Sequence, residues 1–168
     1  MSDTPPLTAT RLWKNMNPAQ RLTAAEAFWR DEEIADDQMQ AVMLIAQQKK
    51  FRPKSVVALD AARKARHLAS ITNLPAGLAA RALIVFHLAD RRPMMSAFLD
   101  ALEIPHENGL IQSEAATPDA SKLAAAVAKL NQEYPAADVS LYLNTLLCQD
   151  PATWGGLADL VQAGNSQP

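Results

Sequence analysis

Cysteine is almost absent from this 168-residue chain, which contains only Cys148. A single cysteine excludes an internal disulfide and any zinc site built from several thiolates. Because Cys148 ends the apolar segment LYLNTLLC, we expect a packed and unreactive thiol. A chain of this length can bury an adequate core without disulfides or metals.

Glycine is also scarce, with five residues, so the glycine-rich loops that cradle phosphates are scarcely available. The chain has no His-Glu-x-x-His zinc motif and no Gly-x-Ser-x-Gly elbow of a hydrolase. The acidic run over residues 31–37 lacks the ligand spacing and central glycine of a calcium loop, and it suits the start of a helix. We therefore expect no cofactor, no metal site and no catalytic residue.

No apolar run is long enough to span a membrane. The most apolar segment, ALIVFHLA at residues 82–89, is interrupted by His87, well short of the roughly twenty apolar residues that a span requires. The N-terminal MSDTPPLTAT has neither the basic start nor the apolar stretch of a secretory signal. We expect a soluble, cytoplasmic protein without membrane contact, with His87 inside a buried helix.

Alanine, in contrast, is abundant, with 32 residues, and 11 prolines punctuate the chain. Alanine is the best helix former, and proline is favoured at the first position of a helix. Asn17-Pro18 therefore predicts a helix over residues 18–30, with Gln20 completing a capping box. Asp60 predicts another helix start further along the chain.

The whole chain is predicted to be helical, because no segment shows the period-two alternation of a half-buried strand. Short connections between about seven to nine helices indicate an all-α fold. We expect a compact, single-domain orthogonal bundle over residues 1–168, with a short helical superhelix as the alternative. The tails, residues 1–10 and 164–168, are expected to be frayed.

Four methionines suit either the core or a binding surface. Met39 and Met43 fall at helical spacing, and Met94 and Met95 follow a proline that starts another helix. Methionine fills gaps in cores and also lines adaptable grooves. We expect core positions for all four, with a binding groove as the alternative.

The adjacent glycines Gly155 and Gly156 follow Trp154 in a segment that otherwise favours helix. Each glycine weakens a helix by roughly 1 kcal/mol relative to alanine. We expect that the pair either allows a close helix contact or separates a single helical turn from the final helix.

Positive charge is concentrated in the middle of the chain, although the net charge is −2. Residues 49–67 contain seven of the sixteen Lys and Arg residues and a single acidic residue, Asp60. Cations are favourable at helix C-termini, which accounts for Lys49 and Lys50. The five remaining Lys and Arg residues of this segment, together with His67 and Arg81, form a candidate binding surface: Arg52, Lys54, Arg63, Lys64, Arg66, His67 and Arg81.

This candidate surface suits an acidic protein partner, the chain's own acidic C-terminal half or the phosphates of a nucleic acid. It lacks the interleaved aromatics of single-strand binders, and the chain has no nucleic-acid motif. We expect a non-catalytic helical interaction protein that binds a protein partner or forms a homo-oligomer. A nucleic-acid-binding domain that uses residues 52–67 is the alternative.

A further alternative is an enzyme or small-molecule-binding protein with His106 and Glu107 at the rim of a pocket. The segment PHENG lies between predicted helices, and loops often carry functional groups. The same residues make an ordinary turn, since Asn108-Gly109 tolerates positive φ. We expect the structural turn, with a loop site at His106 and Glu107 as the alternative.

Overall fold

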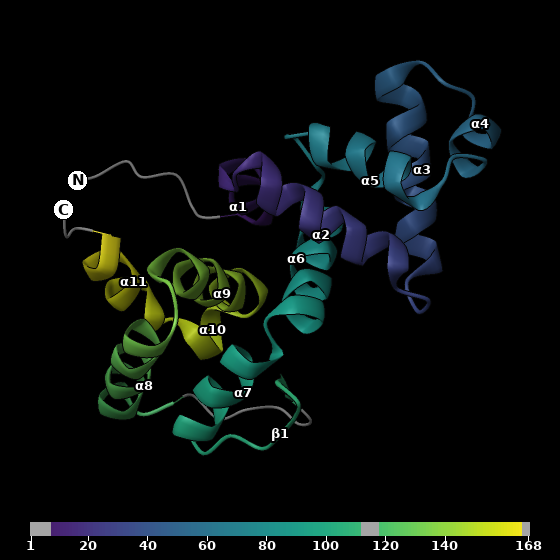
Figure 1. The fold of residues 1–168 in the computed structure, drawn as a ribbon. Coiled ribbons are helices and arrows are strands. Elements are labelled where there is room, and N and C mark those ends of the chain that lie inside the picture. Colours follow the sequence, from purple (N-terminus) through teal and green to yellow (C-terminus); the bar gives the residue numbers. More distant parts are fainter. Residues whose placement is uncertain (1–7, 112–117, 166–168) are drawn as a thin grey trace. The chain divides into compact units, whose positions relative to one another are not determined.

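The computed structural model describes residues 8–111 and 118–165 and is helical almost throughout (Figure 1). In these residues it contains eleven helices and one hairpin of two strands, β1 (His106–Glu107) and β2 (Leu110–Ile111), so the predicted all-α class is confirmed. The helices are α1 (Ala9–Asn15), α2 (Pro18–Arg30), α3 (Ala35–Lys49), α4 (Pro53–Val57), α5 (Ala61–Ser70), α6 (Ala76–Asp90), α7 (Arg92–Ala101), α8 (Ala120–Glu133), α9 (Ala136–Gln149), α10 (Pro151–Trp154) and α11 (Leu157–Asn165). Short segments such as α4 and α10 raise the helix count above the expected number.

The ends of the chain are more helical than the sequence suggests. α1 begins inside the N-terminal segment predicted to be frayed, and the Thr8 hydroxyl caps it by accepting a hydrogen bond from the Arg11 N–H (3.2 Å). α11 continues to Asn165. The remaining residues of the predicted tails, 1–7 and 166–168, lie outside the described residues.

Local capping determines where several helices begin, as the sequence predicts. The Asn17 side chain accepts a hydrogen bond from the Gln20 N–H (2.8 Å), and the Gln20 side chain accepts one from the Asn17 N–H (3.2 Å). Asp60 accepts a hydrogen bond from the Arg63 N–H (2.8 Å) at the start of α5. Each cap satisfies backbone donors that the first helical turn leaves unpaired. The helix predicted over residues 18–30 is confirmed as α2.

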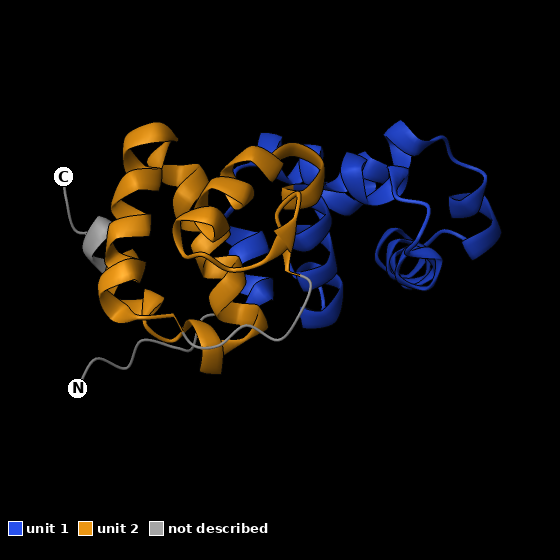
Figure 2. Cartoon of the chain, turned by 90° about the horizontal axis from the view of Figure 1, so that it is seen from below, with its two compact units in different colours: residues 1–86 blue, residues 87–168 orange. Residues whose placement is uncertain are grey.

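Contacts within the chain define two compact units, residues 1–86 (unit 1) and 87–168 (unit 2) (Figure 2). The boundary lies inside α6, which contributes residues to both units. Unit 1 has twelve Lys and Arg against eight Asp and Glu, whereas unit 2 has four against ten, so the units carry net charges of opposite sign. The single domain over residues 1–168 stays a prediction.

The core of unit 1 forms where α2 packs along α5, the most extensive helix contact in that unit. Ala24 and Ala25 on α2 and Ala65 on α5 are fully buried, and their small side chains let the two helices approach closely. Trp13 of α1 is also fully buried, and its indole N–H donates a hydrogen bond to the Ile71 carbonyl (2.8 Å). This bond anchors α1 to the end of α5.

The core of unit 2 is built around Phe98 of α7, which is fully buried. Its ring contacts Tyr142 of α9 and Trp154 of α10, with ring centroids 5.7 and 5.9 Å apart. His87, near the end of α6, is 2% exposed and its ring lies 5.5 Å from that of Tyr142, as expected for a core residue. Cys148 is half-buried, and burial raises the pKa of its thiol, which agrees with the expected low reactivity.

The glycine pair between α10 and α11 serves both purposes expected from the sequence. Gly155 and Gly156 separate the single turn of α10 from α11. A Cβ atom added at Gly156 would lie 3.0 Å from Cδ2 of Leu123 on α8, closer than ordinary van der Waals contact. Glycine therefore allows α8 to pack against the backbone at this point.

The hairpin of β1 and β2 was not predicted. β1 pairs antiparallel with β2, with His106 opposite Ile111. Asn108 and Gly109 form the two-residue loop with φ values of 50° and 90°, so the expected positive φ is confirmed. Asn-Gly is the strongest short sequence signal for a hairpin, but strands of two residues are too short to show alternation.

Candidate interaction surface of unit 1

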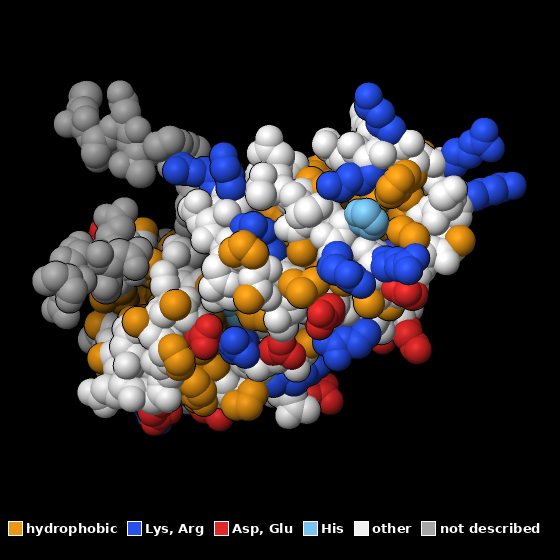
Figure 3. All heavy atoms as spheres, turned by 45° about the horizontal axis from the view of Figure 1, so that its top comes forward, with side chains coloured by type: hydrophobic (Ala, Val, Ile, Leu, Met, Phe, Trp, Pro, Cys, Tyr) orange, Lys and Arg blue, Asp and Glu red, His pale blue; other side chains and the backbone are white. Residues whose placement is uncertain are grey.

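Most of the predicted basic residues lie on one part of unit 1, where α3 ends and α4 and α5 follow. α3 contacts both α4 and α5, so residues from three helices become neighbours. Figure 3 shows Lys and Arg side chains gathered around a histidine, with hydrophobic side chains between them. We call this region the basic surface, and it comprises Lys49, Phe51, Arg52, Lys54, Val57, Arg63, Arg66 and His67.

The turn after α3 determines how this surface is presented. Lys50 adopts the left-handed conformation (φ 59°), and the Phe51 N–H donates to the Ala46 carbonyl (2.9 Å), which ends α3. Pro53 then starts α4 immediately. Because the chain changes direction within so few residues, every residue from 49 to 54 is exposed.

Phe51 lies within the basic surface, and 44% of it is exposed. Its ring is edge-on to that of His67, with centroids 5.6 Å apart and 79° between the planes. Burial lowers the pKa of His67, and the positive charges of Lys49 and Arg66 lower it further. Lys49 belongs to α3 and Arg66 to α5, so cations from two helices act on one imidazole. Sequence reasoning missed Phe51, although cations flank it on both sides in KKFR.

Arg81 does not belong to this surface. Its side chain, on α6, pairs with Asp37 in the first turn of α3 (3.2 Å). Asp37 precedes Lys49 by twelve residues, about 18 Å along the helix axis. The structure therefore separates Arg81 from the other predicted binding residues.

Two further cations of α5, Arg63 and Lys64, differ in the contacts that they make within unit 1. The Lys64 ammonium lies 5.1 Å from the centre of the Trp29 ring, a cation–π contact that holds it against α2. Arg63 lies 3.8 Å from Asp60, but both side chains are 65% exposed. An ion pair that is this exposed to solvent contributes little to stability. Arg63 remains available to a partner, whereas Lys64 already has one within unit 1.

We expect His67 to remain neutral at a pH where an ordinary histidine is already protonated, because its pKa is lowered. In the Arg66→Gln protein the pKa should rise toward the usual value, since one of the two nearby charges is removed. NMR titration of the imidazole measures both effects. The unfolded chain binds this proton more readily than the folded one, so stability decreases as the pH falls through the usual histidine range.

The matched control for this titration is Arg81→Gln, which also removes one positive charge but does so far from His67. It should leave the pKa of His67 unchanged. An unchanged pKa in Arg66→Gln as well would contradict the convergence of α3 and α5 cations on His67.

The positions of the α3 methionines differ from the core positions that the sequence predicts. Met39 and Met43 are 54% and 52% exposed, so the predicted core positions are wrong for them, whereas Met94 and Met95 are buried as expected. α3 has two apolar faces, and packing buried the one with the larger share of branched side chains. The buried face consists of Ala41, Val42, Ile45 and Ala46.

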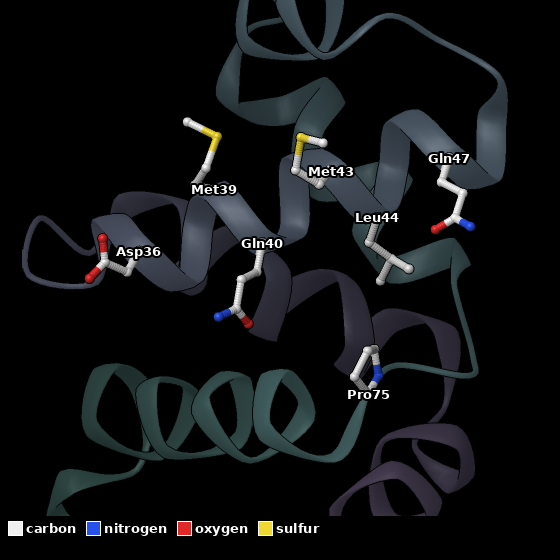
Figure 4. A pocket seen from close by; sticks show the side chains of 7 residues that line it. All are labelled: Asp36, Met39, Gln40, Met43, Leu44, Gln47 and Pro75. Carbon is white, nitrogen blue, oxygen red and sulfur yellow. The ribbon is translucent and has the colours of Figure 1, made fainter.

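A shallow groove of about 620 Å³ runs along the exposed side of α3 (Figure 4). Gln40 and Leu44 extend toward Pro75 at the start of α6, whereas Met39 and Met43 stand on the opposite rim (Figure 4). These two methionines therefore line an exposed groove, and binding in this groove stays a prediction. The lining residues are Asp36, Met39, Gln40, Met43, Leu44, Gln47 and Pro75.

His106 is held by its own turn. Its Nδ1 accepts a hydrogen bond from the Gly109 N–H (3.0 Å), so in the neutral ring Nε2 carries the proton and donates it to the Asp100 carboxylate (2.7 Å). The side chain is 11% exposed, and both nitrogens are used within unit 2. Glu107 beside it is exposed. This geometry supports the structural turn over a loop site.

In the part of the chain that the structure describes, no group of three or more His, Cys, Asp or Glu residues is arranged to hold a metal ion. Among the same residues, no helix combines the length and the apolarity needed to cross a membrane. No protein-family model matches the chain, and no curated protein or solved structure is significantly similar to it. Its function is therefore inferred from the surface of unit 1.

Proposed function

We propose that the protein acts by binding, and that the basic surface holds a segment of a partner protein with acidic and apolar side chains. The observation that carries this proposal is the exposure of Phe51 (44%) and Val57 (52%) in the segment that also contains Arg52 and Lys54. Phe51 also contacts His67, on which the charges of Lys49 and Arg66 act. Aromatic and arginine side chains are enriched in protein interfaces, and clustered exposed apolar residues mark interaction sites. The partner covers Phe51 and Val57 and places carboxylates near Arg52 and Arg66.

The cations and the apolar residues contribute to binding in different ways. An exposed ion pair is worth about 0–1 kcal/mol, so the cations mainly steer and orient an acidic partner. Covering apolar surface contributes about 25 cal/mol per Å², which makes Phe51 the largest single source of affinity. Binding should therefore depend more on Phe51 than on any one cation.

Single-stranded nucleic acid is the second candidate partner. It is favoured by the exposed Phe51 ring among cations, because stacking of a base on an aromatic side chain is worth about 1–3 kcal/mol. Val57 distinguishes the two partners. An apolar peptide covers this side chain, whereas stacking and phosphate contacts do not use it.

The test measures fluorescence anisotropy with two labelled probes, an acidic amphipathic peptide of leucine and glutamate and single-stranded oligothymidine. For the peptide, Phe51→Ser should weaken binding about tenfold, and Val57→Ser and Arg66→Gln about threefold each. Arg81→Gln is the control for Arg66→Gln, because it removes one charge away from the basic surface. It should leave the affinity unchanged.

Three results would overturn the proposal. The first is peptide affinity that does not respond to Phe51→Ser and Val57→Ser, and the second is the absence of peptide binding. The third is oligothymidine binding that weakens steeply with salt and with Phe51→Ser but not with Val57→Ser, which would assign the surface to nucleic acid.

A further inference from the structure

The exposed face of α3 has a regular pattern that the basic surface does not use. Its residues recur every three or four positions and therefore form one stripe along the helix. Two of them, Met39 and Met43, are more than half exposed. We call this face the α3 stripe, and it consists of Asp36, Met39, Gln40, Met43, Gln47 and Lys50.

The two ends of the α3 stripe carry opposite charges. Asp36 lies in the first turn of α3, and Lys50 follows its last residue. Both are exposed, and among the described residues neither makes an ion pair within the chain, whereas the neighbouring Asp37 is paired with Arg81. Asp36 and Lys50 are each seven residues from Met43, about 10 Å along the axis in either direction. The two charged ends of the α3 stripe are thus equally far from Met43, and their charges are opposite.

We propose that the α3 stripe binds the same stripe of a second copy of this chain, with the two helices antiparallel and crossing at Met43. In this register Met43 meets Met43, Met39 meets Gln47, and Asp36 of each chain lies opposite Lys50 of the other. A twofold axis requires such reciprocal pairs, in which the contact from one residue to another occurs twice. Antiparallel packing also places the positive N-terminal end of each helix dipole beside the negative C-terminal end of the other.

Charge complementarity favours a second copy of this chain as the partner of the α3 stripe, and it favours the antiparallel orientation of the two helices. A parallel pair would place Asp36 opposite Asp36 and Lys50 opposite Lys50, and like charges in an interface oppose binding. A uniformly acidic or basic partner would be repelled at one end of the stripe. A second α3 carries the required charges at both ends and adds the apolar surface of two more methionines.

The expected dimer is weak and reversible. One helix face on each chain covers less than the roughly 1,200 Å² typical of stable complexes. The dimer should therefore form as the protein concentration approaches about 0.1–1 mM. It uses a face different from the basic surface, so the two proposals fail or hold independently.

Sedimentation equilibrium over this concentration range tests the proposal with the full chain. The average mass should rise from one chain toward two, and Met43→Glu should weaken dimerisation at least about tenfold, because two carboxylates meet at the twofold axis. Gln48→Glu adds the same charge on an exposed position of α3 outside the stripe and should have little effect. Circular dichroism checks that each variant keeps its helices.

A charge exchange tests the antiparallel register directly. Asp36→Lys and Lys50→Glu should each weaken dimerisation about three- to tenfold, since each places like charges opposite one another twice. A mixture of the two variants should dimerise again, because every pair across that interface is then of opposite charge. The double variant Asp36→Lys/Lys50→Glu should also recover.

A chain that remains monomeric up to 1 mM would overturn the proposal. So would a dimer that Met43→Glu does not weaken, or one in which mixing the two charge variants restores nothing. The last result would show that the copies pair through another face or in another direction.

Discussion

Replacement of Trp13 by alanine is expected to lower the free energy of unfolding by about 3–5 kcal/mol, the range for the removal of a large aromatic side chain from a core. Trp13 is fully buried, and its indole N–H donates to the Ile71 carbonyl at 2.8 Å. Trp13→Ala therefore leaves a cavity and also removes the hydrogen bond that ties α1 to the end of α5. Urea unfolding followed by circular dichroism measures the change.

Two controls separate the causes. Trp13→Phe keeps most of the apolar volume but deprives the buried Ile71 carbonyl of its donor, so the expected loss is smaller, about 1–3 kcal/mol. Lys14→Ala changes an exposed residue of the same helix and should stay within about 0.5 kcal/mol. If Trp13→Ala cost less than about 1 kcal/mol, α1 would not be part of the unit 1 core.

Gly109→Ala is expected to lower the free energy of unfolding by about 2–4 kcal/mol. Two penalties combine at this residue. Its φ is 90°, a conformation that residues with a side chain rarely adopt, and a Cβ atom there would lie 2.7 Å from Cβ of Met95. Cβ of Met95 is attached to the backbone of α7 and cannot rotate away, so the hairpin or α7 must shift. Urea unfolding again measures the effect.

Gly77→Ala is the matched control, because an added Cβ meets nothing within 4 Å and its φ is ordinary. Gly77 lies in α6, where alanine favours helix more than glycine by about 1 kcal/mol, so this change should leave stability unchanged or raise it. Equal effects of the two substitutions would show that the geometry at Gly109 is not the cause of its cost.

The candidate site could be predicted only in part. The sequence indicates Arg52, Arg63 and Arg66 as candidates, because they remain after helix-end charges are explained. It also groups Arg81 with them, since proximity along the chain says nothing about the pairing of Arg81 with Asp37. Phe51 was overlooked because its contact with His67 depends on how α3 packs against α5.

The sequence by itself determined the all-α class and the start of several helices. A cap such as Asn17 or Asp60 acts on a backbone group three residues away, and alanine and proline act on their own backbone conformation. The glycine pair ahead of α11 and the positive φ at Asn108-Gly109 could be predicted for the same reason.

Only the tertiary structure decided which side of α3 is buried. The helix offers two apolar faces, and the choice between them depends on what the other helices of unit 1 present to it. Packing buried Val42 and Ile45 and left Met39 and Met43 exposed. It also placed Lys49 and Arg66 beside one histidine. The basic surface arises from contacts between residues distant in the sequence, and such contacts leave no periodic pattern. The α3 stripe does have a helical period, but only packing decided that this face of α3 stays exposed.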